Sequence, residues 1–112
     1  MDKGLMYICS PYRGRTKRNT RYAAYLTRIA LEAGFIPVTP HLYMTKALNE
    51  KKEAERKLGM QAGIKLLERC DCILIGLKYG ISEGMEKEIE ALDGQSVFTE
   101  ENGILTPRSQ QT

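Results

Sequence analysis

Short apolar runs alternate along the chain with longer segments whose apolar residues recur at helical spacing. Runs typical of buried strands cover residues 5–10, 35–39, 72–77 and 95–98. Segments with helical periodicity lie between them, at residues 19–33, 50–69 and 83–92. The pattern therefore predicts a regular alternation of strand and helix over most of the chain.

Such alternation with short connections predicts an α/β fold. We expect a flavodoxin/Rossmann-like, three-layer α/β/α architecture with a four- to five-stranded parallel sheet. Pro37 lies inside the second strand and favours a sheet edge, because proline has no N–H to donate. We expect residues 1–98 to form the α/β domain. Residues 99–112 are expected to form a C-terminal extension, a tail that could include a short fifth strand at residues 103–105.

Ligands of parallel α/β sheets bind beyond the carboxyl ends of the strands, near the switch in strand order. Three loops should meet at that rim, residues 10–18, 40–49 and 78–82. The sequence therefore predicts that any ligand site is built from these loops.

The amino-acid composition is typical of a folded globular domain. The chain has 112 residues, of which 42% are hydrophobic and 28% charged, with a net charge of +3. No apolar run is long enough to span a bilayer, and the N-terminus lacks the apolar core of a signal peptide. We therefore expect a cytoplasmic protein with no membrane partner.

The three cysteines predict neither disulfides nor a metal centre. Their odd number argues against a disulfide framework. Cys70 and Cys72 flank one aspartate, but the chain holds a single histidine, and Cys9 and Cys72 fall at opposite ends of their predicted strands. We expect no metal and no other cofactor.

The first rim loop combines small residues with positive charge. Ser10 and Gly14 would let the backbone approach a ligand closely, and Arg13 offers paired donors for a phosphate or carboxylate. A solvated basic loop explains the same composition, so both interpretations stay open. The loop is neither a Walker A sequence nor a GxGxxG motif.

Basic residues continue from this loop into the next helix. Five fall within nine positions: Arg13, Arg15, Lys17, Arg18 and Arg21. The net charge is small and few aromatic residues are interleaved, so nucleic-acid binding ranks below a small-molecule partner.

The helix predicted at residues 83–92 carries several acidic residues, of which one stands apart. Ser82 is a suitable N-cap, and acids in the first turns suit the helix dipole. At about 100° per residue, Glu88 falls only about 65° from the centre of the apolar stripe, whereas the other glutamates face solvent. Glu88 is therefore either the structural partner of a cation or a working carboxylate.

His41 ends the second predicted strand at the same rim. A lone histidine is commonly a hydrogen-bonded loop residue, although this position also suits a ligand contact. Tyrosines at this edge could stack on a base or sugar or simply pack, namely Tyr7, Tyr12, Tyr43 and Tyr79.

Three segments give the chain a family resemblance. They read YICSPYRG from Tyr7, PVTPH ending at His41, and CDCILIGLKYGISEGMEKEI from Cys70. Together they resemble the nucleoside 2-deoxyribosyltransferase superfamily, including its 2-deoxynucleoside 5′-monophosphate N-hydrolase branch, and the short uncharacterised relatives are most similar. The last segment, with its Ser-x-Gly-x-x-x-Glu motif, is the most specific.

The resemblance implies N-glycosidic bond cleavage on a nucleoside or nucleoside 5′-monophosphate, by hydrolysis or by deoxyribosyl transfer. It implies that Glu88 is the nucleophile and that Arg13 helps to keep it ionised. The implied substrate-binding residues are Cys9, Ser10, Pro11, Tyr12, Arg13, Gly14, His41, Ser82 and Gly84. A homodimer or larger homo-oligomer is implied as well.

The chain departs from the family pattern at one position. The family carries an aspartate eight residues before the strand-opening aspartate, which is matched here by Asp71, and Gly63 occupies that position. The nearest acids are Glu55 and Glu68. The alternative function is therefore a non-catalytic protein that binds a nucleotide or an ADP-ribose-type signal.

Overall fold

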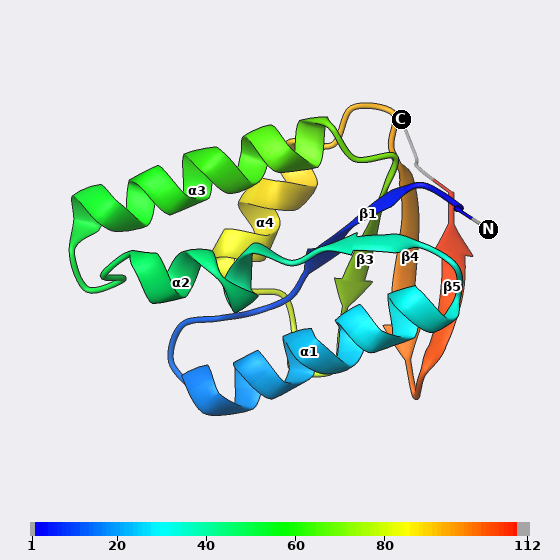
Figure 1. Ribbon diagram of the computed structural model, residues 1–112, viewed down its shortest axis with the longest axis horizontal. Helices are drawn as coiled ribbons and strands as arrows, with labels where there is room; N and C mark the ends of the chain where they lie inside the picture. Colours follow the sequence, from blue (N-terminus) through cyan, green and yellow to red (C-terminus); the bar gives the residue numbers. More distant parts are fainter. Residues whose placement is uncertain (1, 110–112) are drawn as a thin grey trace.

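A computed structural model describes residues 2–109, which form a five-stranded sheet with helices on both faces (Figure 1). The strand order is β2-β1-β3-β4-β5. The strands are β1 (Leu5–Cys9), β2 (Ile36–Val38), β3 (Cys72–Gly76), β4 (Ser96–Glu101) and β5 (Ile104–Arg108). The three-layer α/β/α fold predicted from the sequence is confirmed.

The helices follow the predicted order, with different bounds. They are α1 (Thr16–Glu32), the 3-10 turn η1 (Pro40–Leu42), the short α2 (Met44–Ala47), α3 (Glu53–Glu68) and α4 (Glu83–Glu90). The second rim loop, expected to be irregular, contains η1 and α2. Among residues 2–109, no helix has the length and apolar character needed to cross a membrane.

The two faces of β1 and β3 build two apolar layers, because side chains alternate along a strand. On one face Met6, Ile8 and Leu74 pack against Tyr22 and Leu26 of α1. On the other face Tyr7, Cys9, Ile73 and Ile75 pack with residues of α3 and α4, including Leu67 and Met85. Figure 1 shows α1 on one side of the sheet and α3 with α4 on the other. Strand β3 is buried throughout, as its apolar run predicts.

The sheet is parallel except at β5, which corrects the prediction of a wholly parallel sheet. β4 continues across residue 98 to Glu101 and then pairs antiparallel with β5 through a two-residue turn at Asn102 and Gly103. Both turn residues have positive φ, 50° and 81°, the pairing that a type I′ hairpin requires. The expected tail therefore contains a hairpin, and the fifth strand runs from Ile104 to Arg108 instead of covering residues 103–105.

The elements next to the first strand confirm one local expectation and correct another. β2 pairs only with β1 and lies at the sheet edge, as Pro37 predicts. Helix α1 begins three residues before the expected Asn19, because the Asn19 N–H already donates to the Arg15 carbonyl. The buried Asn19 side chain donates to the Tyr12 carbonyl at 2.9 Å, which ties the first rim loop to the helix.

Candidate functional site

The three rim loops meet around a cavity of about 230 Å³, called here the first cavity. Residues from α3 and the start of α4 complete its wall. Of the residues predicted to act together, those that line it are Ser10, Tyr12, Arg13, His41, Ser82, Gly84 and Glu88. The fold thus brings together side chains that are up to 78 positions apart in the sequence, while their roles stay predictions.

Three other predicted residues do not line the first cavity. Cys9 is fully buried at the end of β1, and Pro11 is buried in the loop. Gly14 is exposed and has a φ of 91°, so it serves the turn of the loop. These residues can shape the cavity wall, but they do not face its interior.

Glu88 is the buried carboxylate of the cavity, with 5% of its surface exposed. The Tyr7 hydroxyl donates a hydrogen bond to Glu88 Oε2. Within residues 2–109 no lysine or arginine forms an ion pair with Glu88. Glu88 turns inward, as the helical spacing predicts. Arg13, which was expected to keep it ionised, forms no ion pair with it, and the neutral Tyr7 hydroxyl is a hydrogen-bond donor to it.

Burial controls the protonation of this carboxyl group. Desolvation raises the Glu88 pKa from 4.5 to about 7, and interactions with Tyr7 and Cys9 oppose the rise. Burial and the nearby Glu88 charge raise the pKa of the Cys9 thiol well above its usual value, and the pKa of the Tyr7 hydroxyl rises for the same reasons. Both partners are therefore neutral near pH 7, and Glu88 is the group of this cluster that titrates there.

Gly63 on α3 lies directly against the Tyr7 hydroxyl. A Cβ atom at Gly63 would be 2.9 Å from that oxygen, closer than real side chains come. The tyrosine hydroxyl therefore occupies the space into which a side chain at position 63 would project. The absence of a side chain at Gly63 leaves room for the Tyr7 hydroxyl, which donates the hydrogen bond to Glu88.

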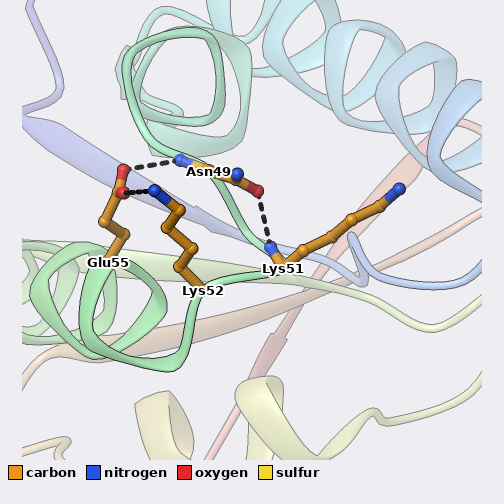
Figure 2. A network of polar contacts seen from close by, with 4 residues as sticks. All are labelled: Asn49, Lys51, Lys52 and Glu55. Atoms are coloured by element: carbon orange, nitrogen blue, oxygen red, sulfur yellow. Dashed lines mark hydrogen bonds and ion pairs between the residues drawn. The ribbon is translucent and has the colours of Figure 1, made fainter.

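The two acids nearest to Gly63 in sequence are engaged elsewhere. Figure 2 shows Glu55 turned toward the loop before α3, where it accepts from the Asn49 N–H at 2.8 Å and lies 4.0 Å from the Lys52 ammonium. Glu68 is exposed and pairs with Lys65 at 3.7 Å. Neither carboxylate lines the first cavity.

His41 is fixed against the first rim loop. Its Nε2 lies 2.9 Å from the Ser10 carbonyl oxygen, which can only accept, so Nε2 carries the proton. The ring stacks on Tyr12 with centroids 5.3 Å apart. Burial lowers the His41 pKa, so the imidazole is neutral at pH 7 and its Nδ1 remains an acceptor.

Ser10 supplies the one buried side-chain polar atom within residues 2–109 that has no hydrogen-bond partner. The residue is 1% exposed and lines the first cavity. An unsatisfied buried hydroxyl costs about 1–3 kcal/mol, so a ligand that hydrogen-bonds to Ser10 Oγ would recover that free energy.

The start of α4 forms the remaining wall. Ser82 caps the helix by accepting from the Met85 N–H at 3.2 Å, which leaves the amides at the helix start near the cavity. Gly84 has the Met60 methyl group 3.3 Å from the place of its absent Cβ. A glycine at this position therefore allows α4 and α3 to approach closely.

Comparison with known proteins places the chain in a family. A profile described as "Domain of unknown function (DUF7768)" matches residues 4–100. The chain belongs to this family. No curated protein matches it.

The DUF7768 chain also resembles a solved structure, that of a 2-deoxyribosyltransferase from the psychrotolerant bacterium Bacillus psychrosaccharolyticus. The TM-score is 0.61 at 11% identity, with 78% of this chain covered. The chain spans 63% of the length of that enzyme's chain. The comparison shows that this chain has the fold of that enzyme, which is described as a biocatalyst for the synthesis of antiviral and antitumoral nucleosides.

The first cavity of DUF7768 contains further polar residues that sequence analysis did not single out. Arg56 and Glu50 come from α3 and the loop before it, and Lys87 pairs with Glu83 at 3.7 Å on α4. Arg56, Met60 and Gly63 follow helical spacing along α3, which is the signal that could have identified this wall. Residues 2–109 contain no cluster of His, Cys, Asp and Glu suited to holding a metal ion.

Proposed function

We propose that this DUF7768 protein hydrolyses the N-glycosidic bond of a nucleoside or nucleoside 5′-monophosphate, with Glu88 as the nucleophile. The observation that supports this most is a buried carboxylate, held by a tyrosine hydroxyl, at the wall of a cavity on the ligand-binding edge of the sheet. The fold shared with a 2-deoxyribosyltransferase supports the same class of chemistry.

The reaction would proceed in two displacements. A Glu88 oxygen attacks the anomeric carbon, and the carbon–nitrogen bond breaks with its electron pair leaving on the base. A proton must reach the base as it departs. Water then attacks the same carbon of the glycosyl-enzyme and gives one proton to the group that protonated the base, so that Glu88 is released as carboxylate and the sugar keeps its configuration.

The Tyr7 contact suits the nucleophile's need for a defined orientation and charge. A hydroxyl donated to Oε2 leaves Oε1 as the oxygen for attack and favours the ionised form. With a pKa of about 7, a substantial fraction of Glu88 is ionised at neutral pH. The carboxylate is also poorly solvated, which makes it more reactive than a surface glutamate.

Hydrolysis is proposed ahead of transfer because the residue at position 63 cannot handle a proton. Gly63 replaces the aspartate that the family resemblance associates with the base or sugar. Three glutamates line the first cavity, and two of them belong to α4. The third, Glu50, could protonate the leaving base. Transfer requires the protein to bind and orient a second nucleobase as acceptor, whereas hydrolysis uses water as the acceptor.

Anionic and hydroxyl groups of the substrate have partners in the same cavity. Arg13 and Arg56 line it, and neither forms an ion pair within residues 2–109. Together with the amides at the start of α4, they suit a 5′-phosphate. Ser10 Oγ suits a sugar hydroxyl.

The proposal is tested by incubating the protein with a pool of nucleosides, deoxynucleoside monophosphates and NAD-type dinucleotides, beside Glu88→Ala. Mass spectrometry should find free base with wild type and none with Glu88→Ala. Free base in neither sample, with a nucleotide carried intact through desalting by both proteins, would instead support the second candidate, a nucleotide-binding protein. That candidate is favoured specifically by the absence of an acid at position 63.

A further inference from the structure

A second cavity of about 550 Å³ opens on the α1 side of the sheet. Its walls come from α1, from the loop after β3 and from the end of β4 with the following turn. It shares no lining residue with the first cavity. Leu77–Tyr79 line the second cavity and Ser82–Gly84 line the first, so one loop borders both.

Three cations of the second cavity form no ion pair in the part of the chain that the structure describes, although two carboxylates, Glu100 and the exposed Glu101, also line it. Arg18, Arg21 and Lys78 line it, and none of them forms an ion pair within residues 2–109. The buried Glu100 carboxylate is already occupied, since it accepts from the Tyr22 hydroxyl at 2.6 Å and from the Gly103 N–H at 2.9 Å. The first turn of α1 has no acidic residue, so its dipole adds to the positive potential.

Aromatic rings stand beside these cations. The Arg18 guanidinium lies over the Tyr79 ring, with its carbon 3.9 Å from the centroid, and Tyr22 meets the same ring edge-on at 5.2 Å. Tyr79 is 36% exposed, and Tyr25, whose ring stacks with that of Tyr22 at 6.2 Å between centroids, is 43% exposed. The basic run in the sequence lacked interleaved aromatics, and the fold supplies them from another loop and another turn of α1.

This combination fits one ligand chemistry. A phosphate group is attracted by arginine and lysine side chains that lack a carboxylate partner. A nucleobase stacks on exposed tyrosine rings and on a guanidinium plane. Because the Arg18 guanidinium already lies over the Tyr79 ring, less side-chain entropy is lost when it binds a ligand.

We propose that the second cavity binds a nucleotide unit, with its phosphate on Arg18, Arg21 and Lys78 and its base against the exposed ring of Tyr25. The unit could be a free mononucleotide or part of a single-stranded nucleic acid. The site is independent of the proposed hydrolysis, because none of its residues takes part in that reaction.

The test measures binding of two probes at low salt. Fluorescence anisotropy follows fluorescein-labelled deca-deoxythymidylate, and calorimetry follows adenosine 5′-monophosphate. The double variant Arg21→Gln/Lys78→Gln should weaken binding of whichever probe binds by at least about tenfold, and should reduce the salt slope for the decamer by about one. Tyr25→Ala should weaken it by about tenfold as well.

Two control variants make the result decisive. Arg28→Gln removes one positive charge from α1, as Arg21→Gln does, but away from the cavity, and should change binding by less than about twofold. Arg56→Gln alters the first cavity and reports binding there. A decamer-only response identifies single strands as the source, and a response to both probes identifies the mononucleotide unit.

Three results would overturn the proposal. The first is that neither probe binds. The second is that Arg28→Gln weakens binding as much as the double variant does. The third is that Arg56→Gln abolishes binding that the double variant retains. In the last case the nucleotide occupies the first cavity, which leaves the proposed hydrolase untouched.

Discussion

At the scale of single residues, the account rests on a buried glutamate and its tyrosine partner. Glu88 comes from α4 and Tyr7 from β1, yet they form one hydrogen-bonded pair inside the first cavity. The helical period was sufficient to predict that Glu88 turns inward. Tyr7 could not be assigned to it, because the two positions are 81 residues apart and only the packing of α3 and α4 on the sheet joins them.

Glu88→Gln should make the stability of the protein less dependent on pH. The folded-state pKa of about 7 lies above the usual 4.5, so folding favours the protonated form. The stability that this form contributes is complete below pH 4.5, declines as the pH rises, and is lost above pH 7. The difference in unfolding free energy between the glutamine variant and wild type should therefore change with pH. It should favour the variant by about 3 kcal/mol more at pH 8.5 than in strong acid.

Urea denaturation of both proteins between pH 5 and pH 8.5 measures this difference. Glu86→Gln, an exposed change on the same helix, is the matched control and should leave the pH dependence of wild type intact. Parallel curves for wild type and Glu88→Gln would contradict the buried, destabilised carboxylate.

Tyr7→Phe should move the pH dependence of base release to higher pH. The hydroxyl lowers the Glu88 pKa, so its removal raises that pKa further and demands higher pH for the ionised nucleophile. The acidic limb of the rate profile should shift upward by about one pH unit, from the strength of a hydrogen bond to a charged group. Tyr43→Phe, which lies outside both cavities, should leave the limb unmoved; an unshifted limb in Tyr7→Phe would contradict the proposed role of the hydroxyl.

At the scale of elements, the glycine face of α3 sets the shape of the first cavity. The sequence predicted this helix, but its bounds moved inward by three residues at the start and one at the end, where no periodic residue marks the boundary. Alternation predicted the strands on either side of this helix, but not their order in the sheet. The β4–β5 turn was missed although Asn102-Gly103 is a strong hairpin signal, because the flanking segment was too polar to be interpreted as strands.

Gly63→Ala and Gly59→Ala should have opposite effects on stability. Alanine gains about 1 kcal/mol of helix propensity at either position. At Gly59 the new methyl lies 3.1 Å from the flexible end of Leu48, which can move, so the gain should survive. At Gly63 it lies 2.9 Å from the buried Tyr7 hydroxyl, and overpacking should cost about 1–3 kcal/mol.

Thermal and urea unfolding of the two variants beside wild type measure these free energies. A gain in stability for Gly63→Ala equal to that of Gly59→Ala would mean that Tyr7 does not press against α3, and the arrangement of the first cavity would have to be revised.

At the scale of the whole molecule, the antiparallel strand β5 forms one edge of the sheet that carries both cavities. The alternation of strands and helices predicted the class of fold and the edge at which ligands bind. It could not predict that the two rim cavities lie on opposite faces, since that depends on which side each helix covers. Nor could it place the C-terminal hairpin, whose Glu100 is buried by a contact with Tyr22, 78 residues away.

A chain ended at residue 98 should therefore fail to fold cooperatively. It loses half of β4, all of β5 and the Glu100 carboxylate that Tyr22 bonds to. A chain ended at residue 109 keeps the hairpin and serves as the control. Circular dichroism during heating should give a sharp transition for the longer chain and none for the shorter; a shared transition temperature would show that the hairpin is dispensable.

The most direct test of the central claim is to locate the glycosyl group on the protein. Wild type and Glu88→Ala are mixed with a substrate, quenched in acid within milliseconds to seconds, digested and sequenced by mass spectrometry. The account predicts a glycosyl adduct on Glu88 in wild type, no adduct in the variant, and a loss of base release on the order of 10³-fold or more. Base release that persists in Glu88→Ala, or an adduct on another residue, would contradict it.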